Sequence, residues 1–199
     1  MIMKKLLGYT LIELMTVLAV VSILVSVGLP LMNVFFESNR MISNTNELVA
    51  GLHIARSEAI KQQARVTMCQ SDDQANCTNS GRWEDGFIVF VDTGGAAAGN
   101  ATVDPGERIL RVNAGADGPQ VTIRSNDALN QITNSVTFTS RGLPKATNGA
   151  AQSGIFRICD DRGLKVNADG ASTVARGVVL SLSGKVRTTK NVVKIASCT

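Results

Sequence analysis

An uncharged run of 23 residues, from Leu14 to Phe36, constrains this chain more than any other feature of its sequence. At about 1.5 Å rise per residue, a helix of this length measures about 34 Å and covers a bilayer core of about 30 Å. Lys4 and Lys5 precede the run, and positive charges stay on the cytoplasmic side of a membrane. We therefore expect a single membrane-spanning helix, with the remainder of the chain outside the cytoplasm.

A secretory signal peptide and a plain membrane anchor are the two alternatives. The end of the run has no Ala-x-Ala cleavage site, and the run is longer than a typical signal-peptide core. A plain anchor leaves Glu13 unexplained, because an unpaired carboxylate at the edge of a membrane helix costs about 2.5 kcal/mol or more. Glu13 needs a cationic partner, and no Lys or Arg lies within a helical turn after it.

Cleavage of the chain after Gly8 would create such a partner, the new α-amino group of Tyr9. Tyr9 and Glu13 are four residues apart, so they share one face of a helix. In an assembly the amine could equally come from a neighbouring subunit, and the ion pair would then fix the register between subunits. We therefore expect Glu13 to set assembly register.

The segment Gly8-Tyr-Thr-Leu-Ile-Glu13-Leu resembles the class III signal of type IV pilins and type II secretion pseudopilins. The resemblance implies that a prepilin peptidase cuts after Gly8 and methylates the new N-terminus at Tyr9, where most members have Phe. Residues 1–8 would then be a leader peptide. Its loss removes Lys4 and Lys5 and lowers the formal net charge from +4 to +2.

The helix is expected to run from about Tyr9 to about Gln63, with residues 9–36 in the membrane and residues 37–63 amphipathic. Gly28 and Pro30 predict a kink or a locally melted stretch, because proline removes one helix hydrogen bond and clashes with the preceding turn. After Phe36, apolar residues recur at helical spacing and indicate a helix laid on a sheet. They are Met41, Leu48, Leu52, Ala55, Ala59 and Ile60.

Residues 64–199 are expected to form a β-rich globular head. The fold class is therefore α+β and type IV pilin-like, with a long N-terminal helix packed on antiparallel β-sheets. Short β-rich runs separated by polar, glycine-containing segments predict the strands. The predicted strands cover residues 66–69, 87–91, 109–112, 121–123, 136–138, 155–159, 178–182 and 192–195.

Several segments of the head are similar to the GspH/FimT group of minor pilins. They are the helix segment from Asn46 to Ile60, Trp83-Glu-Asp-Gly86 followed by Phe-Ile-Val-Phe, Glu107-Arg-Ile-Leu-Arg111, and Cys159-Asp160. The resemblance covers nearly the whole chain and implies two β-sheets against the C-terminal half of the helix. Within that frame we expect Trp83 to pack at the start of a strand.

Four cysteines form two natural groups, Cys69 with Cys77 and Cys159 with Cys198. An even count in an exported chain predicts disulfides, although four cysteines allow three connectivities. No two cysteines have the spacing of a metal site, so we expect neither a metal nor a cofactor.

An enzymatic role is not expected from this inventory. The chain has one histidine, and it contains neither a Gly-x-Ser-x-Gly turn nor a phosphate-binding glycine loop. Asp92, Asp104 and Glu107 fit no established spacing for calcium ligands.

The last thirty residues, from Gly170, hold five basic and no acidic residues. A solvated sheet face is the plain explanation. As the alternative, Lys185 and Arg187 would share one strand face, and Thr188, Thr189 and Lys190 would follow in a loop. Two or three cations beside hydroxyl groups could grip phosphates without reading bases. Gly184-Lys-Val-Arg187 resembles the Gly-Arg-x-Arg motif of DNA-binding FimT-type pilins, although Lys185 lacks the bidentate fork of Arg.

These observations favour a minor pilin of a type IV pilus that primes assembly or sits in the tip complex. A DNA-binding minor pilin for natural transformation and a minor pseudopilin, the type II secretion system protein H, are the alternatives. The implied partners are other minor and major pilins, the prepilin peptidase, the inner-membrane assembly platform and, for the DNA-binding alternative, DNA. The implied location is the inner membrane, with a single pass, a periplasmic head and incorporation into a filament.

Overall fold

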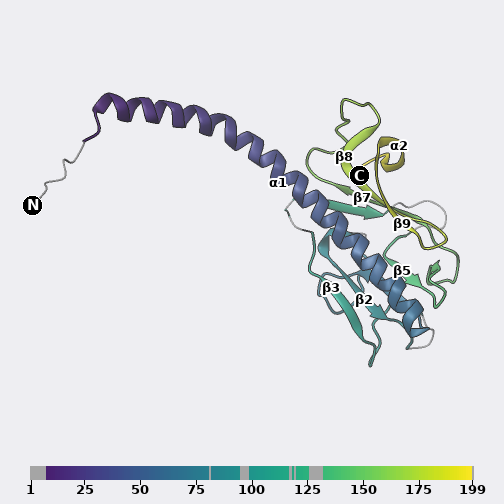
Figure 1. Cartoon of the computed structure of the whole chain (residues 1–199). Coiled ribbons are helices and arrows are strands. Elements are labelled where there is room, and N and C mark those ends of the chain that lie inside the picture. Colours follow the sequence, from purple (N-terminus) through teal and green to yellow (C-terminus); the bar gives the residue numbers. More distant parts are fainter. Residues whose placement is uncertain are drawn as a thin grey trace, which may run out of the picture. The chain divides into compact units, whose positions relative to one another are not determined.

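The computed structural model describes residues 8–80, 82–94, 99–116, 118, 120–125 and 132–198. The chain divides into two compact units, Met1–Asn39 and Arg40–Thr199. Of the expected leader, residues 1–7 lie outside the described residues. Elements are labelled in Figure 1.

The long helix α1 comprises Leu11–Gln62, 52 residues, and thus begins two residues later than expected. The hydroxyl of Thr10 accepts a hydrogen bond from the backbone N–H of Glu13 at 3.3 Å, as an N-cap residue does. The helix is assigned without a break across Gly28 and Pro30, and the kink stays a prediction. Among the described residues, no helix has the length and hydropathy of a membrane span.

Nine strands form two antiparallel sheets in the described part of the second unit. The five-stranded sheet has the order β3-β2-β1-β5-β6 and the four-stranded sheet the order β4-β7-β8-β9. The first contains β1 (Val66–Gln70), β2 (Phe87–Val91), β3 (Ile109–Asn113), β5 (Ser135–Phe138) and β6 (Pro144–Lys145). The second contains β4 (Thr122–Ser125), β7 (Gly154–Cys159), β8 (Ser172–Leu180) and β9 (Val186–Asn191).

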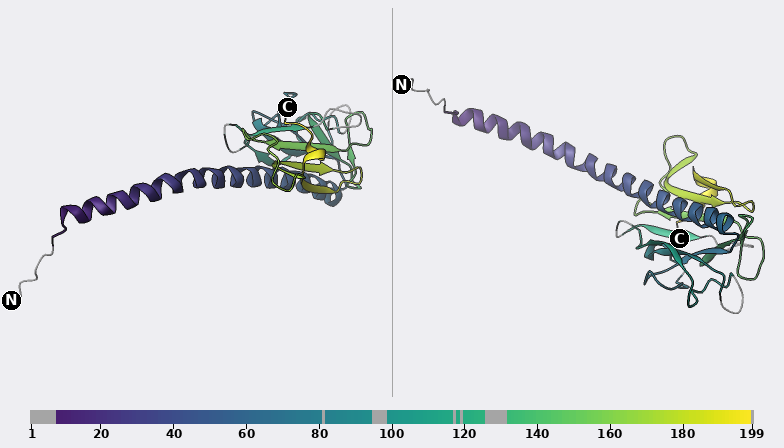
Figure 2. Two further views of the ribbon diagram at one scale, coloured as in Figure 1. Left: turned by 90° about the horizontal axis from the view of Figure 1, so that it is seen from above. Right: turned by 60° about the horizontal axis from the view of Figure 1, so that its bottom comes forward.

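One hydrophobic core joins the C-terminal part of α1 to both sheets, and both views in Figure 2 show this part of the helix running along them. Every other residue of a strand faces the helix, as the pleat of a sheet requires. The core members include Leu48 and Leu52 of α1, Met68 of β1, and Phe156 and Val178 of the second sheet. The expected core positions on the helix are confirmed except for Ile60, which is 43% exposed.

Each sheet has an outer face that is covered by a segment held by a disulfide. The Cys69–Cys77 bond ties the loop after β1 to the outer face of the five-stranded sheet, over Ile88 and Phe90. The Cys159–Cys198 bond ties the C-terminal segment to the other sheet. Both cysteine groups noted in the sequence are therefore bonded pairs.

Two predictions about the C-terminal segment are wrong. Residues 192–195, predicted as a strand, form the single-turn helix α2 (Val192–Ile195), because the side chain of Asn191 caps it by accepting from the Lys194 N–H at 3.2 Å. Helical spacing lets Ile195 be buried on the sheet while Val193 stays 85% exposed. Thr188, Thr189 and Lys190, predicted as a loop, belong to β9, which pairs with β8.

Gly51 sets how closely α1 approaches the five-stranded sheet. A Cβ added at Gly51 would lie 2.7 Å from Cε2 of the Phe87 ring and 3.2 Å from Cε of Met68. Both neighbours are themselves buried, so the core has little room to adjust.

We predict that Gly51→Ala lowers the free energy of unfolding by about 1–2 kcal/mol, because overpacking outweighs the helix propensity that alanine gains. Urea unfolding of the full chain in detergent, followed by the fluorescence of the sole tryptophan, Trp83, measures this. As a control, Ser57→Ala on the exposed helix face should change stability by less than about 0.5 kcal/mol. A stabilised Gly51→Ala protein would contradict the close approach.

Candidate functional sites

The expected cleavage point lies in a short exposed segment before α1. Gly8, Tyr9 and Thr10 precede the helix and are exposed, Tyr9 by 85%. A Cβ added at Gly8 meets no atom within 4 Å, so packing does not require glycine there. Exposed backbone outside regular structure is where proteases cut most readily. The position is therefore exposed, and packing among the described residues does not account for the glycine.

Glu13 lies in the first turn of α1, where the helix dipole favours a carboxylate. Its backbone is engaged by Thr10 and by the hydroxyl of Thr16, which donates to the Glu13 carbonyl at 2.9 Å. Within the described part of the chain, its carboxylate has no ion-pair partner. Within the described residues the carboxylate is thus available for an ion pair.

The turn between β8 and β9 is fixed to α1 by an arginine. Nη1 of Arg56 donates to the Gly184 carbonyl at 2.8 Å, and Nη2 donates to the Ser183 carbonyl at 3.1 Å. Gly184 has a φ of 75°, and an added Cβ would lie 2.2 Å from the carbonyl oxygen of Gly142. A side chain therefore does not fit at Gly184. Glycine is therefore required at this position by packing. The cations of Lys185 and Arg187, which follow it, take no part in this contact.

Lys185 and Arg187 line one groove on the outside of the β8–β9 hairpin, hereafter the outer groove. Its volume is about 520 Å³, and its lining combines cations with hydroxyl groups and contains no carboxylate. The lining residues are Val179, Ser181, Ser183, Lys185, Arg187, Thr188, Thr189 and Lys194. The shared location predicted for Lys185 and Arg187 is confirmed. Lys194 also lines the outer groove, because it lies in α2 and not in the strand that was predicted for residues 192–195.

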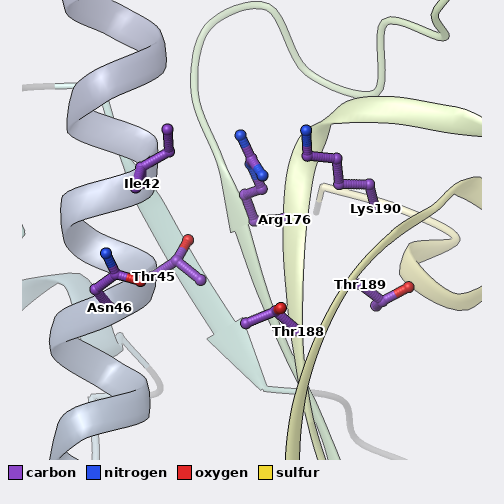
Figure 3. Close-up of a pocket in the computed structure, with 7 residues that line it drawn as sticks. All are labelled: Ile42, Thr45, Asn46, Arg176, Thr188, Thr189 and Lys190. Carbon is purple, nitrogen blue, oxygen red and sulfur yellow. The ribbon is translucent and has the colours of Figure 1, made fainter.

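Lys190 does not join the outer groove. It lines a separate pocket of about 190 Å³ beside α1, together with Arg176 (Figure 3). Lys190 was predicted in a loop after Lys185 and Arg187, and the structure places it in β9, at a different pocket. The two pockets share Thr188 and Thr189 and differ in the cations that line them. Arg176 is a second cation that the sequence reading did not single out.

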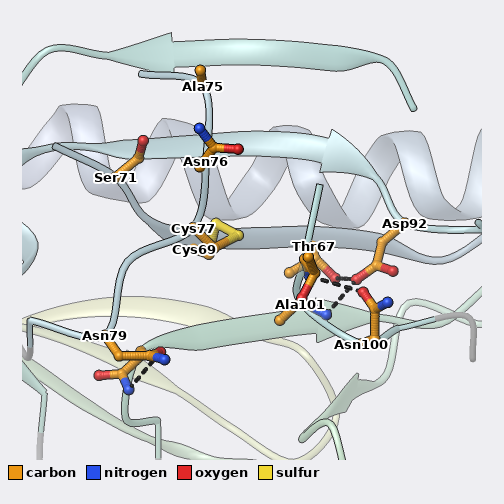
Figure 4. The surroundings of a disulfide bond; sticks show 12 residues. Thr67, Cys69, Ser71, Ala75, Asn76, Cys77, Asn79, Asp92, Asn100 and Ala101 are labelled. Atoms are coloured by element: carbon orange, nitrogen blue, oxygen red, sulfur yellow. Dashed lines mark hydrogen bonds between the residues drawn. A yellow bond between two sulfur atoms is a disulfide. The ribbon is translucent and has the colours of Figure 1, made fainter. Parts of the chain in front are cut away.

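Asp92 has a structural role and is not free to bind calcium. It is fully buried and accepts hydrogen bonds from the Thr67 hydroxyl at 2.6 Å and from the Ala101 N–H at 3.0 Å (Figure 4). Glu107 likewise accepts from backbone N–H groups of Thr93 and Gly94. No group of three or more potential metal ligands occurs among the described residues.

The Trp83-Glu-Asp-Gly86 segment is also structural. Trp83 is buried, stacks edge-on against Phe156 with ring centroids 5.0 Å apart, and donates its indole N–H to the Thr133 carbonyl at 3.1 Å. Glu84 accepts from the Ile123 N–H and pairs with Arg124. Trp83 opens the short 3-10 helix Trp83–Asp85, directly before β2, so the expected packing role at a strand start is confirmed.

Two family models match this chain. The model of the type II transport protein GspH matches residues 44–184, and that of the prokaryotic N-terminal methylation motif matches residues 3–29. The first model covers the C-terminal part of α1 and most of the head. The second covers Gly8, Tyr9, Glu13 and the first part of the uncharged run.

Two solved structures are similar to the chain, both of the type IV minor pilin FimU of Pseudomonas aeruginosa strain PAO1. The crystal structure in space group P21 is 24% identical, covers 78% of this chain and 92% of that chain, and has a TM-score of 0.52. The structure in space group P65 is 23% identical, with coverage of 74% and 90% and a TM-score of 0.47. The first similarity confirms the expected fold class, a helix packed on antiparallel sheets. No curated protein matches the chain.

Proposed function

Because the chain belongs to the family of the type II transport protein GspH, we propose that it is a minor pilin of a type IV pilus, which primes assembly or sits in the tip complex. The observation that carries the proposal is that one chain contains both an N-terminal methylation motif and a head of the GspH family. An N-terminal methylation motif leads directly into a helix whose other end packs on a head of this family. The family consists of structural pilins, and we propose no enzymatic activity for this member.

The N-terminal part would act in three steps. The prepilin peptidase would cut after Gly8 and methylate Tyr9. Residues 9–36 would hold the subunit in the inner membrane, with the head in the periplasm, until the assembly platform adds it to a filament. Glu13 would then pair with the α-amino group of Tyr9 in its own chain or in a neighbour and so fix the register between helices.

A minor pseudopilin of a type II secretion system is the second candidate. The description of the matching family as a type II transport protein favours it. The two disulfides favour the pilus. The genes beside this one would decide between the two systems. Both candidates use the same leader, helix and head.

We predict that the mature protein starts at Tyr9. The exposed, non-helical position of the Gly8–Tyr9 bond makes it accessible before the helix begins. Mass spectrometry of the protein purified from membranes should give a chain that lacks residues 1–8 and carries one N-terminal methyl group. A mature start beyond Pro30 would refute the filament proposal.

We predict that Glu13→Ala leaves cleavage intact and blocks incorporation into filaments. The side chain of Glu13 forms no ion pair within the described chain, so its loss should not affect the head. Immunoblots of sheared filaments and of membranes measure the two steps separately. Thr16→Ala, one turn further along the helix, serves as the control and should be incorporated normally. Normal incorporation of the Glu13 variant would show that it does not set register.

DNA uptake is a third candidate, and the outer groove favours it. Lys185, Arg187 and Lys194 surround serine and threonine hydroxyls, the combination that contacts phosphates without reading bases. The hydrogen bonds from Arg56 of α1 to the Ser183 and Gly184 carbonyls would hold these cations at a fixed position.

We predict that, if the chain binds DNA, Lys185→Ala plus Arg187→Ala weakens binding. The slope of log K against log salt, which is negative, should become less steep by about 2. A gel shift with duplex DNA and the full chain in detergent, over a salt series, measures this. Lys190→Ala removes a charge from the same strand but outside the outer groove, and it should leave the slope nearly unchanged. No shift at low salt would exclude the DNA candidate.

A further inference from the structure

A small cationic pocket lies between α1 and the β8–β9 hairpin, apart from the outer groove (Figure 3). We refer to it as the Arg176 pocket. Its volume is about 190 Å³, and it is lined by Ile42, Thr45, Asn46, Arg176, Thr188, Thr189 and Lys190. These residues include two cations and no carboxylate. The pocket plays no part in cleavage, membrane anchoring or the Glu13 ion pair.

Arg176 is the unusual residue of this pocket. Its Nε is buried without a hydrogen-bond partner, and within the described residues its guanidinium forms no ion pair. Burial, together with the nearby charge of Arg162, lowers the pKa of Arg176, although an arginine remains protonated. A charge that is partly removed from water without a partner is costly, and a bound anion would offset that cost.

The other lining groups complete a site for an oxyanion. In Figure 3 the guanidinium of Arg176 and the ammonium of Lys190 lie at the same end of the pocket, near Ile42. The hydroxyl of Thr188 and the amide of Asn46 have no hydrogen bond within the described residues, so both can donate. Thr45, in contrast, donates its hydroxyl proton to the Met41 carbonyl at 2.6 Å.

We propose that the Arg176 pocket binds an aspartate or glutamate side chain of a neighbouring pilin and is a contact between heads in the filament. The guanidinium of an arginine matches a carboxylate in a two-bonded geometry, which gives such a contact direction as well as charge. Ile42, 42% exposed at the rim, would contact the methylene groups of the incoming side chain. The proposal rests on the proposed function, because it needs a neighbouring pilin.

The size and position of the pocket favour a protein carboxylate over a nucleic-acid phosphate. A volume of about 190 Å³ admits one side chain, and α1 and β9 form walls on two sides. A phosphate within a nucleic-acid backbone would bring its sugars against both walls. An acidic side chain reaches such a small pocket on a flexible stem, whereas the outer groove, at about 520 Å³, has more room for a nucleic-acid backbone.

In-cell crosslinking of the full chain in filament-forming cells tests the contact. A photoreactive benzoylphenylalanine at position 42 should crosslink to another pilin, within a peptide that contains Asp or Glu. Lys190→Glu should lower the crosslink yield about tenfold. A close pair of opposite charges across a protein interface changes affinity by at least about this factor. Lys185→Glu makes the same charge change in the outer groove and should leave the yield unchanged.

A charge swap completes the experiment. Reversing the acidic residue of the crosslinked peptide to lysine, in cells that carry Lys190→Glu, should restore the crosslink. Lys190 is exposed, so the variant should fold, and intact disulfides on a non-reducing gel verify this. Arg176→Gln, which keeps a polar side chain without the charge, should also lower the yield.

The outcomes separate this inference from the proposed function. A crosslink to DNA, a crosslinked peptide without an acidic residue, an unchanged yield in Lys190→Glu, or a swap that fails to restore it would overturn the pocket assignment alone. Absence of the unsubstituted chain from sheared filaments would instead overturn the proposed function.

Discussion

The contact between the C-terminal part of α1 and the two sheets is the constraint on which the head depends. Each sheet buries its inner face in the same core, around Leu48, Leu52 and Ala55 of the helix. Burial of such side chains contributes about 1.5–3 kcal/mol each for the larger ones, which is large against the stability of a domain. Small residues at Gly51 and Ala55 let the helix approach closely. The C-terminal part of the helix is therefore the centre of the core of the head.

The same contact positions both cationic surfaces of the head. Arg56 holds the β8–β9 turn by donating to two backbone carbonyls. Because Gly184 has no side chain, the Gly142 backbone can lie close to it. The hairpin is thus fixed relative to the helix, and the outer groove and the Arg176 pocket adjoin each other at Thr188 and Thr189, which line both. A rigid hairpin can present different charges to different partners, because the pleat of a strand separates alternate side chains.

The sequence predicted most of the fold because its signals were local. Helical spacing located the buried positions of α1, and β-rich runs located β1, β2 and β7 to within about two residues at their ends. The failures have tertiary causes. Val192-Val-Lys-Ile195 reads as a strand by composition, yet Asn191 caps a helical turn there and Ile195 is buried on the sheet. Ile60 fits the helical period but lies beyond the edge of the core.

The candidate sites divide in the same way. Gly8, Tyr9 and Glu13 belong to a linear motif, so sequence alone is enough to predict their roles, and those roles stay predictions. The cationic surfaces depend on strand phase, and phase was misjudged where residues 188–190 were predicted as a loop. Lys190 belongs to β9 and lines another pocket than Arg187 does. Arg176 comes from the neighbouring strand, β8, and only the pairing of β8 with β9 brings the two cations together.

The bond between Cys159 and Cys198 has a consequence for where the protein can work. It joins two cysteines that are 39 positions apart in the sequence and holds the segment after β9 against the outer face of the second sheet. Lys194 lies in that segment and supplies one side of the outer groove. Thiols in the cytoplasm are kept reduced, whereas the periplasm oxidises them. If the head is exported as proposed, a freshly made subunit lacks this constraint on its groove, and export completes the surface.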